Sequence, residues 1–525
     1  MTARGISFRS ISRSAAILTG SAAGVQVVGI VREVFVAANV GLSSGYDALL
    51  IALVIPTTFA TLLTAGTVTA MIPAYLEVRD GEGQLPASRL AGAILFWIGV
   101  IGLTMWLLLE AVAPFAIAVV GPGLDAAGRA AAVSYLHVVA PIALISAITA
   151  ILSAVCQAEQ QFRVIALSGF VGAATTLGAT LGLWPALELG ALAIGNLAGP
   201  IASAIVLTAA VLRSGHAPRL TLWTRRDQLT SFTRHAAPLT LSSTILQLNP
   251  VIDRAIATLI GPGAVSALRY ADVLVRTPVG AISPAWATAI YPPLIQAANQ
   301  GIAGLGAATS RAVRYILVAF VPIAALTIAV APIAVAVGFG RGAFTQADVV
   351  LTAQAAVGFA PMIVVQMAYP PFTGALNARR RGTVLLAGGV LNVCLNVVFD
   401  LAFGLTIGAA GIALSSSLTA MLILVFFTRR LATAEPDFEV APISRTLLLA
   451  VLSSLPVAVP IGLLCWLGVV PADLVSGLVA LALFGALGLI SYLVVAIRLG
   501  LQEAAAFAEI ARRWLPYRRT QRASR

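Results

Sequence analysis

Long apolar segments dominate this chain and limit what it can fold into. Fourteen runs of about 20 or more mostly apolar residues lie along its 525 residues, and about 20 such residues suffice for one helix to cross a bilayer. Hydrophobic residues make up 59% of the sequence and charged residues 10%, whereas a soluble domain carries roughly 25% charged residues. The sequence therefore predicts an all-α polytopic membrane protein. The predicted spans lie near residues 15–40, 46–76, 90–114, 130–156, 162–184, 189–212, 235–260, 264–296, 312–338, 347–377, 382–405, 407–428, 443–468 and 474–497.

The basic residues are all arginines, and their distribution predicts the topology. The net charge is +12, and the arginines gather before the first span, after even-numbered spans and in the tail "RRWLPYRRTQRASR". Cytoplasmic loops are enriched in basic residues, so both termini are expected in the cytoplasm. This pattern favours contact with anionic phospholipids over a nucleic-acid partner, which we do not expect.

Two halves of the chain resemble each other. The segment "SRSAAILTGSA" from Ser12 is similar to "TRHAAPLTLSS" from Thr233, and "CQAEQQF" from Cys156 meets "LNARRRG" from Leu376 at nearly the same offset. Each half would hold six spans, and an even number of spans gives both halves the same orientation, as in parallel-repeat transporters. We expect these regions: a first six-helix lobe over 1–212, a cytoplasmic linker over 213–234, a second lobe over 235–430, two further helices over 431–498 and a basic cytoplasmic tail over 499–525.

Motifs for enzymatic chemistry do not occur in the sequence. A chain without lysine cannot carry the phosphate-binding lysine of a Walker A loop, and neither an HExxH motif nor a cysteine pair at zinc spacing is present. We therefore expect a transporter rather than an enzyme and no cofactor, with sodium coupling or the membrane potential as possible driving forces.

Charged residues inside predicted spans are the strongest signal for a functional site, because a charge in hydrocarbon is costly. Arginine would suit an anionic phosphate group, because its planar fork donates two hydrogen bonds and stays charged. The alternative is internal ion pairing that only fixes helix packing, and Asp47 could simply face the positive end of its own helix. The candidate cavity residues are Arg32, Glu33, Asp47, Arg254, Arg269, Asp272 and Arg276.

A second set of polar residues could hold a small cation. Asn392 and Asn396 are four residues apart on one helix face, and with Asp253 and Ser416 they could offer oxygen atoms to sodium. The alternative is hydrogen bonding between helices, which is common for asparagine in membranes.

Several motifs resemble the MurJ/MviN lipid II flippases of the multidrug/oligosaccharidyl-lipid/polysaccharide exporter superfamily. They include "VREVFVAANVGLSSGYDALLIALVIP", "NPVIDRAIATLIGPGAVSALRYADVLVRTPVG", "GRGAFTQAD" and "AGIALSSSL". The resemblance implies a flippase that moves an undecaprenyl-pyrophosphate-linked saccharide, lipid II for the cell wall, to the outer leaflet by alternating access. It also implies a bacterial inner-membrane location and a groove for the lipid tail in the last two helices. We expect a monomer and leave open its association with a cell-wall synthesis complex.

The resemblance also implies site residues. Arg32 and Asp47 match a cavity arginine and aspartate of the family, and Asp253 and Asn392 match sodium-site positions. Other family positions hold different residues here: Gln26, Ala60, Ala65 and Val273. Three alternatives therefore stay open: a flippase for another polyprenyl-linked glycan such as an exopolysaccharide or O-antigen, a cation-coupled multidrug exporter, and a non-transporting scaffold.

Overall fold

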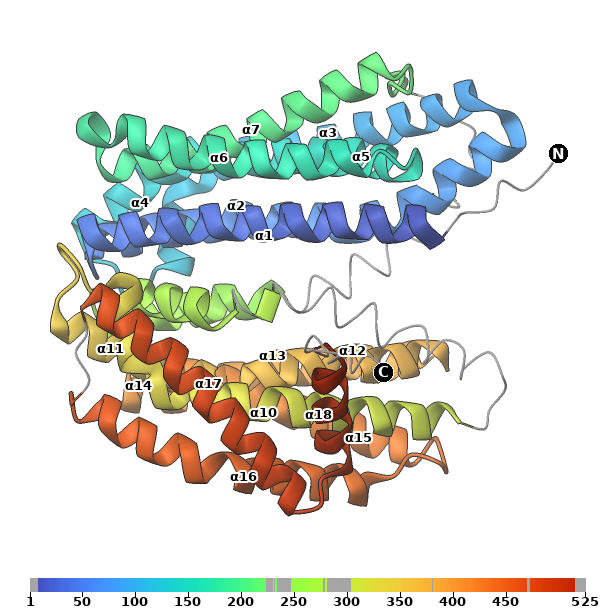
Figure 1. The fold of residues 1–525 in the computed structure, drawn as a ribbon. Coiled ribbons are helices and arrows are strands. Elements are labelled where there is room, and N and C mark those ends of the chain that lie inside the picture. The colour runs from blue at the N-terminus through green and yellow to red at the C-terminus, as the bar shows by residue number, and fades with distance from the viewer. Residues whose placement is uncertain are drawn as a thin grey trace, which may run out of the picture. The chain divides into compact units, whose positions relative to one another are not determined.

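The computed structural model describes residues 8–222, 230, 232–233, 247–276, 279–280, 304–379, 381–469 and 473–514. These residues form helices joined by short turns, without a strand among them (Figure 1). The helices are α1 (Phe8–Val40), α2 (Ser44–Glu82), α3 (Gln84–Val120), α4 (Ala126–Val139), α5 (Ile142–Ala158), α6 (Phe162–Leu187), α7 (Leu189–Arg213), α10 (Leu305–Phe339), α11 (Gln346–Phe359), α12 (Met362–Ala378), α13 (Gly382–Phe399), the π-helix η1 (Asp400–Gly404), α14 (Leu405–Ile407), α15 (Ala409–Ala432), α16 (Val440–Trp466), α17 (Leu474–Arg498) and α18 (Gln502–Trp514).

The apolar runs fold into helices because a helix satisfies its own backbone hydrogen bonds in the bilayer. In the described part of the chain, twelve helical stretches are long and apolar enough to cross a membrane. The two other predicted spans, near 235–260 and 264–296, extend into residues that the structure does not describe, and their described parts, 247–260 and 264–276, are helical. The prediction of an all-α polytopic membrane protein is confirmed.

Helix boundaries repeat along the chain at a constant spacing. Helices α5 and α12 both begin and end 220 residues apart. The same spacing separates the starts of α4 and α11, and those of α6 and α13. In both halves a proline, Pro141 or Pro361, stands directly before the second helix of a broken span. The helix boundaries therefore support the internal repeat that the sequence predicts.

One span differs between the halves. Helix α6 is α-helical throughout, whereas its counterpart changes from α13 to the π-helix η1 at Asp400. Wide turns of this type are rare and occur often at functional sites. The second half therefore has an irregular backbone next to a charged residue inside the membrane.

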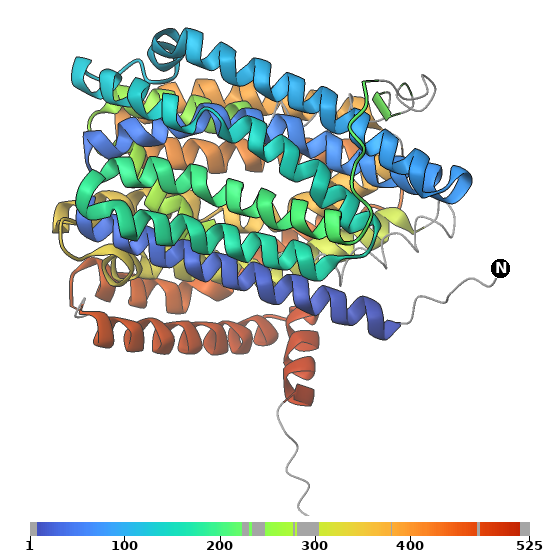
Figure 2. The same cartoon turned by 90° about the horizontal axis from the view of Figure 1, so that it is seen from above.

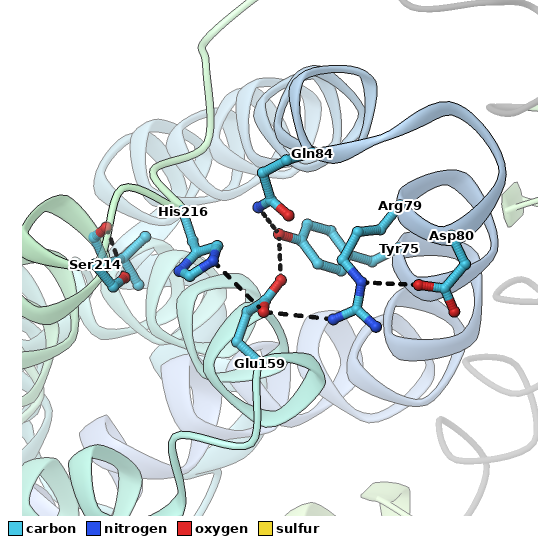
Figure 3. A network of polar contacts seen from close by, with 8 residues as sticks. Tyr75, Arg79, Asp80, Gln84, Glu159, Ser214 and His216 are labelled. Atoms are coloured by element: carbon cyan, nitrogen blue, oxygen red, sulfur yellow. Dashed lines mark hydrogen bonds and ion pairs between the residues drawn. The ribbon is translucent and has the colours of Figure 1, made fainter. Parts of the chain in front are cut away.

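A polar network joins the turn after α5 to neighbouring segments (Figure 3). The Glu159 carboxylate accepts a hydrogen bond from the Tyr75 hydroxyl at 3.0 Å and lies 3.4 Å from Nη1 of Arg79 and 3.5 Å from Nε2 of His216. At the equivalent turn, 220 residues later, Arg379 pairs with Glu435. Both halves thus use an ion pair to hold this turn against the segment after their last helix, with the charges exchanged.

The helices group into two compact units. The first contains Met1–Val273, Arg341–Asp348 and Gly389–Ser415, and the second contains Leu274–Gly340, Val349–Gly388 and Ser416–Arg525. Buried residues of α2, α3 and α5 form a core in the first unit, and α10 packs against α16 in the second. This grouping follows packing contacts, so the predicted lobe boundaries at 212, 234, 430 and 498 stay a prediction.

Candidate functional site

A cavity of about 290 Å³ lies in the first unit, among α1, α2, α7 and the helical residues 247–260 and 264–276. Its other lining residues are leucines and one valine. The lining contains three arginines and no carboxylate, so the cavity surface is positively charged. Its polar lining residues are Arg32, Tyr46, Thr57, Asn196, Arg254 and Arg269.

Glu33 joins two of these arginines from below the cavity surface. Its side chain is 2% exposed, and its Oε1 atom accepts hydrogen bonds from Nη2 of Arg32 at 2.8 Å and Nη2 of Arg269 at 2.7 Å. Its Oε2 atom accepts from the Tyr46 hydroxyl at 3.2 Å. A buried charge is tolerated only when it is paired and hydrogen-bonded. Glu33 therefore fixes the two arginines and neutralises one of their charges.

Asn196 of α7 orients Arg32 from the other side. Its Oδ1 atom accepts from Nη1 of Arg32 at 3.0 Å, while its own Nδ2 atom donates to the carbonyl of Leu192 at 2.8 Å. An amide anchored to its own helix in this way holds the guanidinium in one orientation. Asn196 is the same distance from Ser416 in the sequence, 220 residues, as the equivalent helices are from each other.

Arg254 differs from the other two arginines. It lines the cavity, yet among the described residues its guanidinium makes no hydrogen bond or ion pair within standard distances. With Arg32 and Arg269 sharing the single charge of Glu33, the three arginines leave about two positive charges unpaired. This part of the cavity can therefore bind an anion without first breaking an internal ion pair at Arg254.

Asp47 has a different partner from those that the sequence suggests. Its two carboxylate oxygens accept from the backbone N–H groups of Gly263 at 2.6 Å and Ser266 at 2.7 Å. These groups belong to the first turn of the helix over 264–276, whose N–H groups have no partner within the helix. Asp47 of α2 thus caps another helix, and it does not line the cavity.

We expect Asp47→Ala to lower the free energy of unfolding by about 2–3 kcal/mol, because two buried N–H groups would lose their acceptor. The measurement is denaturant unfolding of the purified protein in detergent. Asp47→Asn, which keeps one acceptor oxygen, should lose less. If both variants unfold like the parent chain but fail to transport, Asp47 contacts the substrate instead.

A second polar cluster surrounds the start of η1. The Asp400 carboxylate accepts from Nδ2 of Asn396 at 3.1 Å and from the Ser415 hydroxyl, and it also shares a hydrogen bond with Asp253. Asp400, Asn396 and Ser415 are almost completely buried. The Oδ1 atom of Asn396 has no hydrogen-bond partner among the described residues. Two carboxyl groups in contact, beside a buried acceptor without a donor, fit a small cation such as sodium, which binds oxygen ligands.

The structure separates some residues that the sequence groups together. Asn392 is not bonded to Asp400, because its Oδ1 atom accepts from Nδ2 of Asn249. Ser416 and Arg276 belong to the second compact unit, and Asp272 is not among the cavity lining residues. Of the predicted cation ligands, Asp253 and Asn396 lie at the cluster.

Sequence reasoning missed Asn196 and Asp400. Both are polar residues inside apolar spans, which is a recognised signal for function. Asp400 also follows Asn396 at a spacing of four residues, which places both side chains on one helical face. Tyr46 offered no comparable signal, because tyrosine is ordinary near the end of a membrane helix.

Comparison with known proteins gives a consistent family. The family model described as lipid II flippase MurJ matches residues 36–485. A probable lipid II flippase MurJ of Rhizobium meliloti (strain 1021) is 25% identical over 422 residues, which cover 77% of each chain. The lipid II flippase MurJ of Burkholderia cenocepacia is 25% identical over 418 residues, covering 76% of this chain and 79% of the relative.

Solved structures support the same fold. A lipid II flippase MurJ in an inward closed conformation superposes with a TM-score of 0.74 at 18% identity, covering 93% of this chain and 98% of that one. An inward-facing multidrug resistance transporter of the MATE family and MOP superfamily superposes with a TM-score of 0.64 at 15% identity, covering 79% and 94%. At these identities the likeness concerns the fold.

Proposed function

Because the chain belongs to the lipid II flippase MurJ family, we propose that its three-arginine cavity holds the pyrophosphate of lipid II during translocation across the membrane. The protein is a transporter, and its substrate is a lipid-linked saccharide. The observation that carries the assignment is the cavity lining, which has three arginines and no carboxylate. Arg254 supplies an unpaired guanidinium, while Glu33 and Asn196 hold the other guanidinium groups in place.

The charge of the cavity agrees with this cargo. The three arginines and Glu33 together carry a net charge of about +2, and a pyrophosphate linked at both ends carries two ionisable oxygens. Arginine donates to phosphate through two parallel hydrogen bonds, which fixes orientation as well as charge. An exporter of organic cations would need uncompensated acids instead, so the cavity disfavours the multidrug alternative.

The second unit offers a surface for the lipid tail. An apolar cavity of about 370 Å³ lies between α10 and α16 and is lined by alanines, aliphatic residues, Gly462 and Trp466. Trp466 donates through Nε1 to the carbonyl of Ile328 at 3.2 Å, which fixes its ring beside the cavity. This supports the groove expected for the lipid tail. The bacterial inner membrane and cytoplasmic termini complete the proposal.

Complementation tests the cargo. The intact gene should restore growth to a bacterium depleted of its own lipid II flippase. The matched control is the same gene with Arg254→Ala, with both proteins quantified in the membrane. Full-length protein in the membrane without growth would favour a flippase for another polyprenyl-linked glycan, because such a cargo carries the same pyrophosphate but a different saccharide.

The Asp400 cluster supports a second proposal, a sodium site made of Asp253, Asn396, Asp400 and Ser415. Sodium should raise the melting temperature of the purified protein relative to choline at equal ionic strength, because a ligand that binds only the folded state stabilises it. The shift should vanish in Asp400→Asn.

Asn392→Ala is the matched control for this sodium test. Asn392 bonds to Asn249 rather than to the cluster, so this variant should keep the sodium shift. A sodium shift that persists in Asp400→Asn and disappears in Asn392→Ala would place the cation one helical turn away, at the position that the sequence first suggested.

A further inference from the structure

A second polar cavity, of about 390 Å³, lies in the second unit, where α10, α16 and the first turn of α18 meet. It is formed by residues outside the three-arginine cavity and the Asp400 cluster. The remaining lining residues are small or apolar, and they include Leu449 and Leu501. Its polar lining residues are Arg314, Arg445, Thr446, Gln502 and Glu503.

The charges in this cavity do not cancel. Nη1 of Arg314 lies 3.0 Å from Oε1 of Glu503, whose side chain is 9% exposed, so these two charges neutralise each other. The buried Nε atom of Arg314 still has no acceptor among the described residues. Arg445 is exposed and makes no hydrogen bond or ion pair within the described part of the chain. One positive charge therefore remains available at the cavity.

Helix α18 adds a further positive end. Gly500 adopts a φ of +81°, a left-handed conformation that glycine reaches easily, and α18 leaves α17 at a steep angle (Figure 2). Buried Leu501 and Ala504 fix its first turn, and Phe507 meets Tyr315 of α10 edge to face at 5.8 Å. The first-turn N–H groups of a helix favour negative charge. Glu503 uses part of this potential, and Arg445 adds to it.

The cavity continues into a surface that suits lipid. Leu448 and Leu452 follow Arg445 by three and seven residues, so the three side chains share one face of α16. Both leucines are exposed, at 58% and 45%, within a helix apolar enough to span the membrane. A molecule held at Arg445 by its phosphate could therefore lay an acyl chain along this face.

We propose that this cavity binds the phosphodiester headgroup of an anionic phospholipid from the leaflet nearest the C-terminal tail. Arg445 and the first turn of α18 hold the phosphate, Thr446 and Gln502 offer further donors, and the acyl chains follow Leu448 and Leu452. Basic cavities between membrane helices commonly hold anionic headgroups in this way. A soluble phosphate would use the same donors but would gain nothing from the leucine face.

Native mass spectrometry of the full-length protein in non-ionic detergent can test this site. The probes are dioctanoylphosphatidylglycerol and dioctanoylphosphatidylcholine. The parent chain should retain the anionic lipid preferentially, and Arg445→Ala should weaken its binding by about five- to tenfold, since one arginine near a membrane contributes about 1 kcal/mol or slightly more. Phosphatidylcholine retention should not change.

The matched control is Arg311→Ala, which removes an exposed arginine one turn before Arg314 on α10 and outside the cavity lining. It should bind phosphatidylglycerol like the parent chain. Equal losses in Arg311→Ala and Arg445→Ala would overturn the site in favour of general surface charge. Displacement of the lipid by millimolar glycerol phosphate would overturn the lipid assignment in favour of a soluble phosphate.

Discussion

Arg254→Ala is expected to reduce lipid II translocation by about 10- to 100-fold, the effect of losing a charged hydrogen bond to phosphate. The free energy of unfolding should hardly change, because Arg254 makes no hydrogen bond or ion pair among the described residues. The measurement is translocation of lipid II in reconstituted vesicles, with denaturant unfolding of the same preparation. An arginine that serves only helix packing would show the opposite pattern.

Arg254→Lys is the control for this prediction. Lysine keeps the charge but lacks the planar fork, so translocation should fall between that of the parent chain and Arg254→Ala. Equal translocation by all three proteins would remove Arg254 from the substrate site. Asn196→Leu gives a further comparison, because it releases Arg32 without removing any charge.

Glu33→Ala is expected to lower the free energy of unfolding by about 3–5 kcal/mol, the usual cost of removing one partner from a buried ion pair. Arg32 and Arg269 would then face each other across the cavity without the carboxylate that both now share. The Tyr46 hydroxyl would also lose its acceptor. Denaturant unfolding and the yield of folded protein in detergent measure this effect.

Glu33→Gln separates charge from hydrogen bonding. Glutamine keeps an acceptor oxygen for one arginine, so this variant should fold better than Glu33→Ala while the cavity becomes more positive. A second-site change, Arg269→Ala in the Glu33→Ala background, should recover part of the lost stability. Lack of any recovery would mean that repulsion between the arginines is not the cause.

The fold could be predicted from the sequence because its main signals are local. Apolar runs of sufficient length set the helices, and the similarity between the segments at Cys156 and Leu376 located the repeat to within a residue of the helix boundaries. The breaks at Pro141 and Pro361 and the π-helix at Asp400 were not predicted. Hydrophobic runs do not distinguish a continuous helix from a broken one.

The site could be predicted only in part, because partners far apart in the sequence decide it. The sequence contains four candidate arginines and four candidate acids in the predicted spans, a balance that leaves the sign of the cavity open. The structure resolves two of the acids: Asp47 binds backbone N–H groups more than 200 residues away, and Asp253 lies beside Asp400. Only packing could reveal that these carboxylates are turned to other partners.

The unpaired charge of the three-arginine cavity has a consequence for electrical work. When pyrophosphate fills the cavity, the two negative charges of the cargo offset the net charge of about +2, so the loaded cavity crosses the field of the bilayer as a neutral body. The empty cavity does not, and two charges moved through about 100 mV change its energy by about 4.6 kcal/mol. A negative cell interior would therefore speed the return of the empty protein to the cytoplasmic side and leave the loaded step almost unaffected.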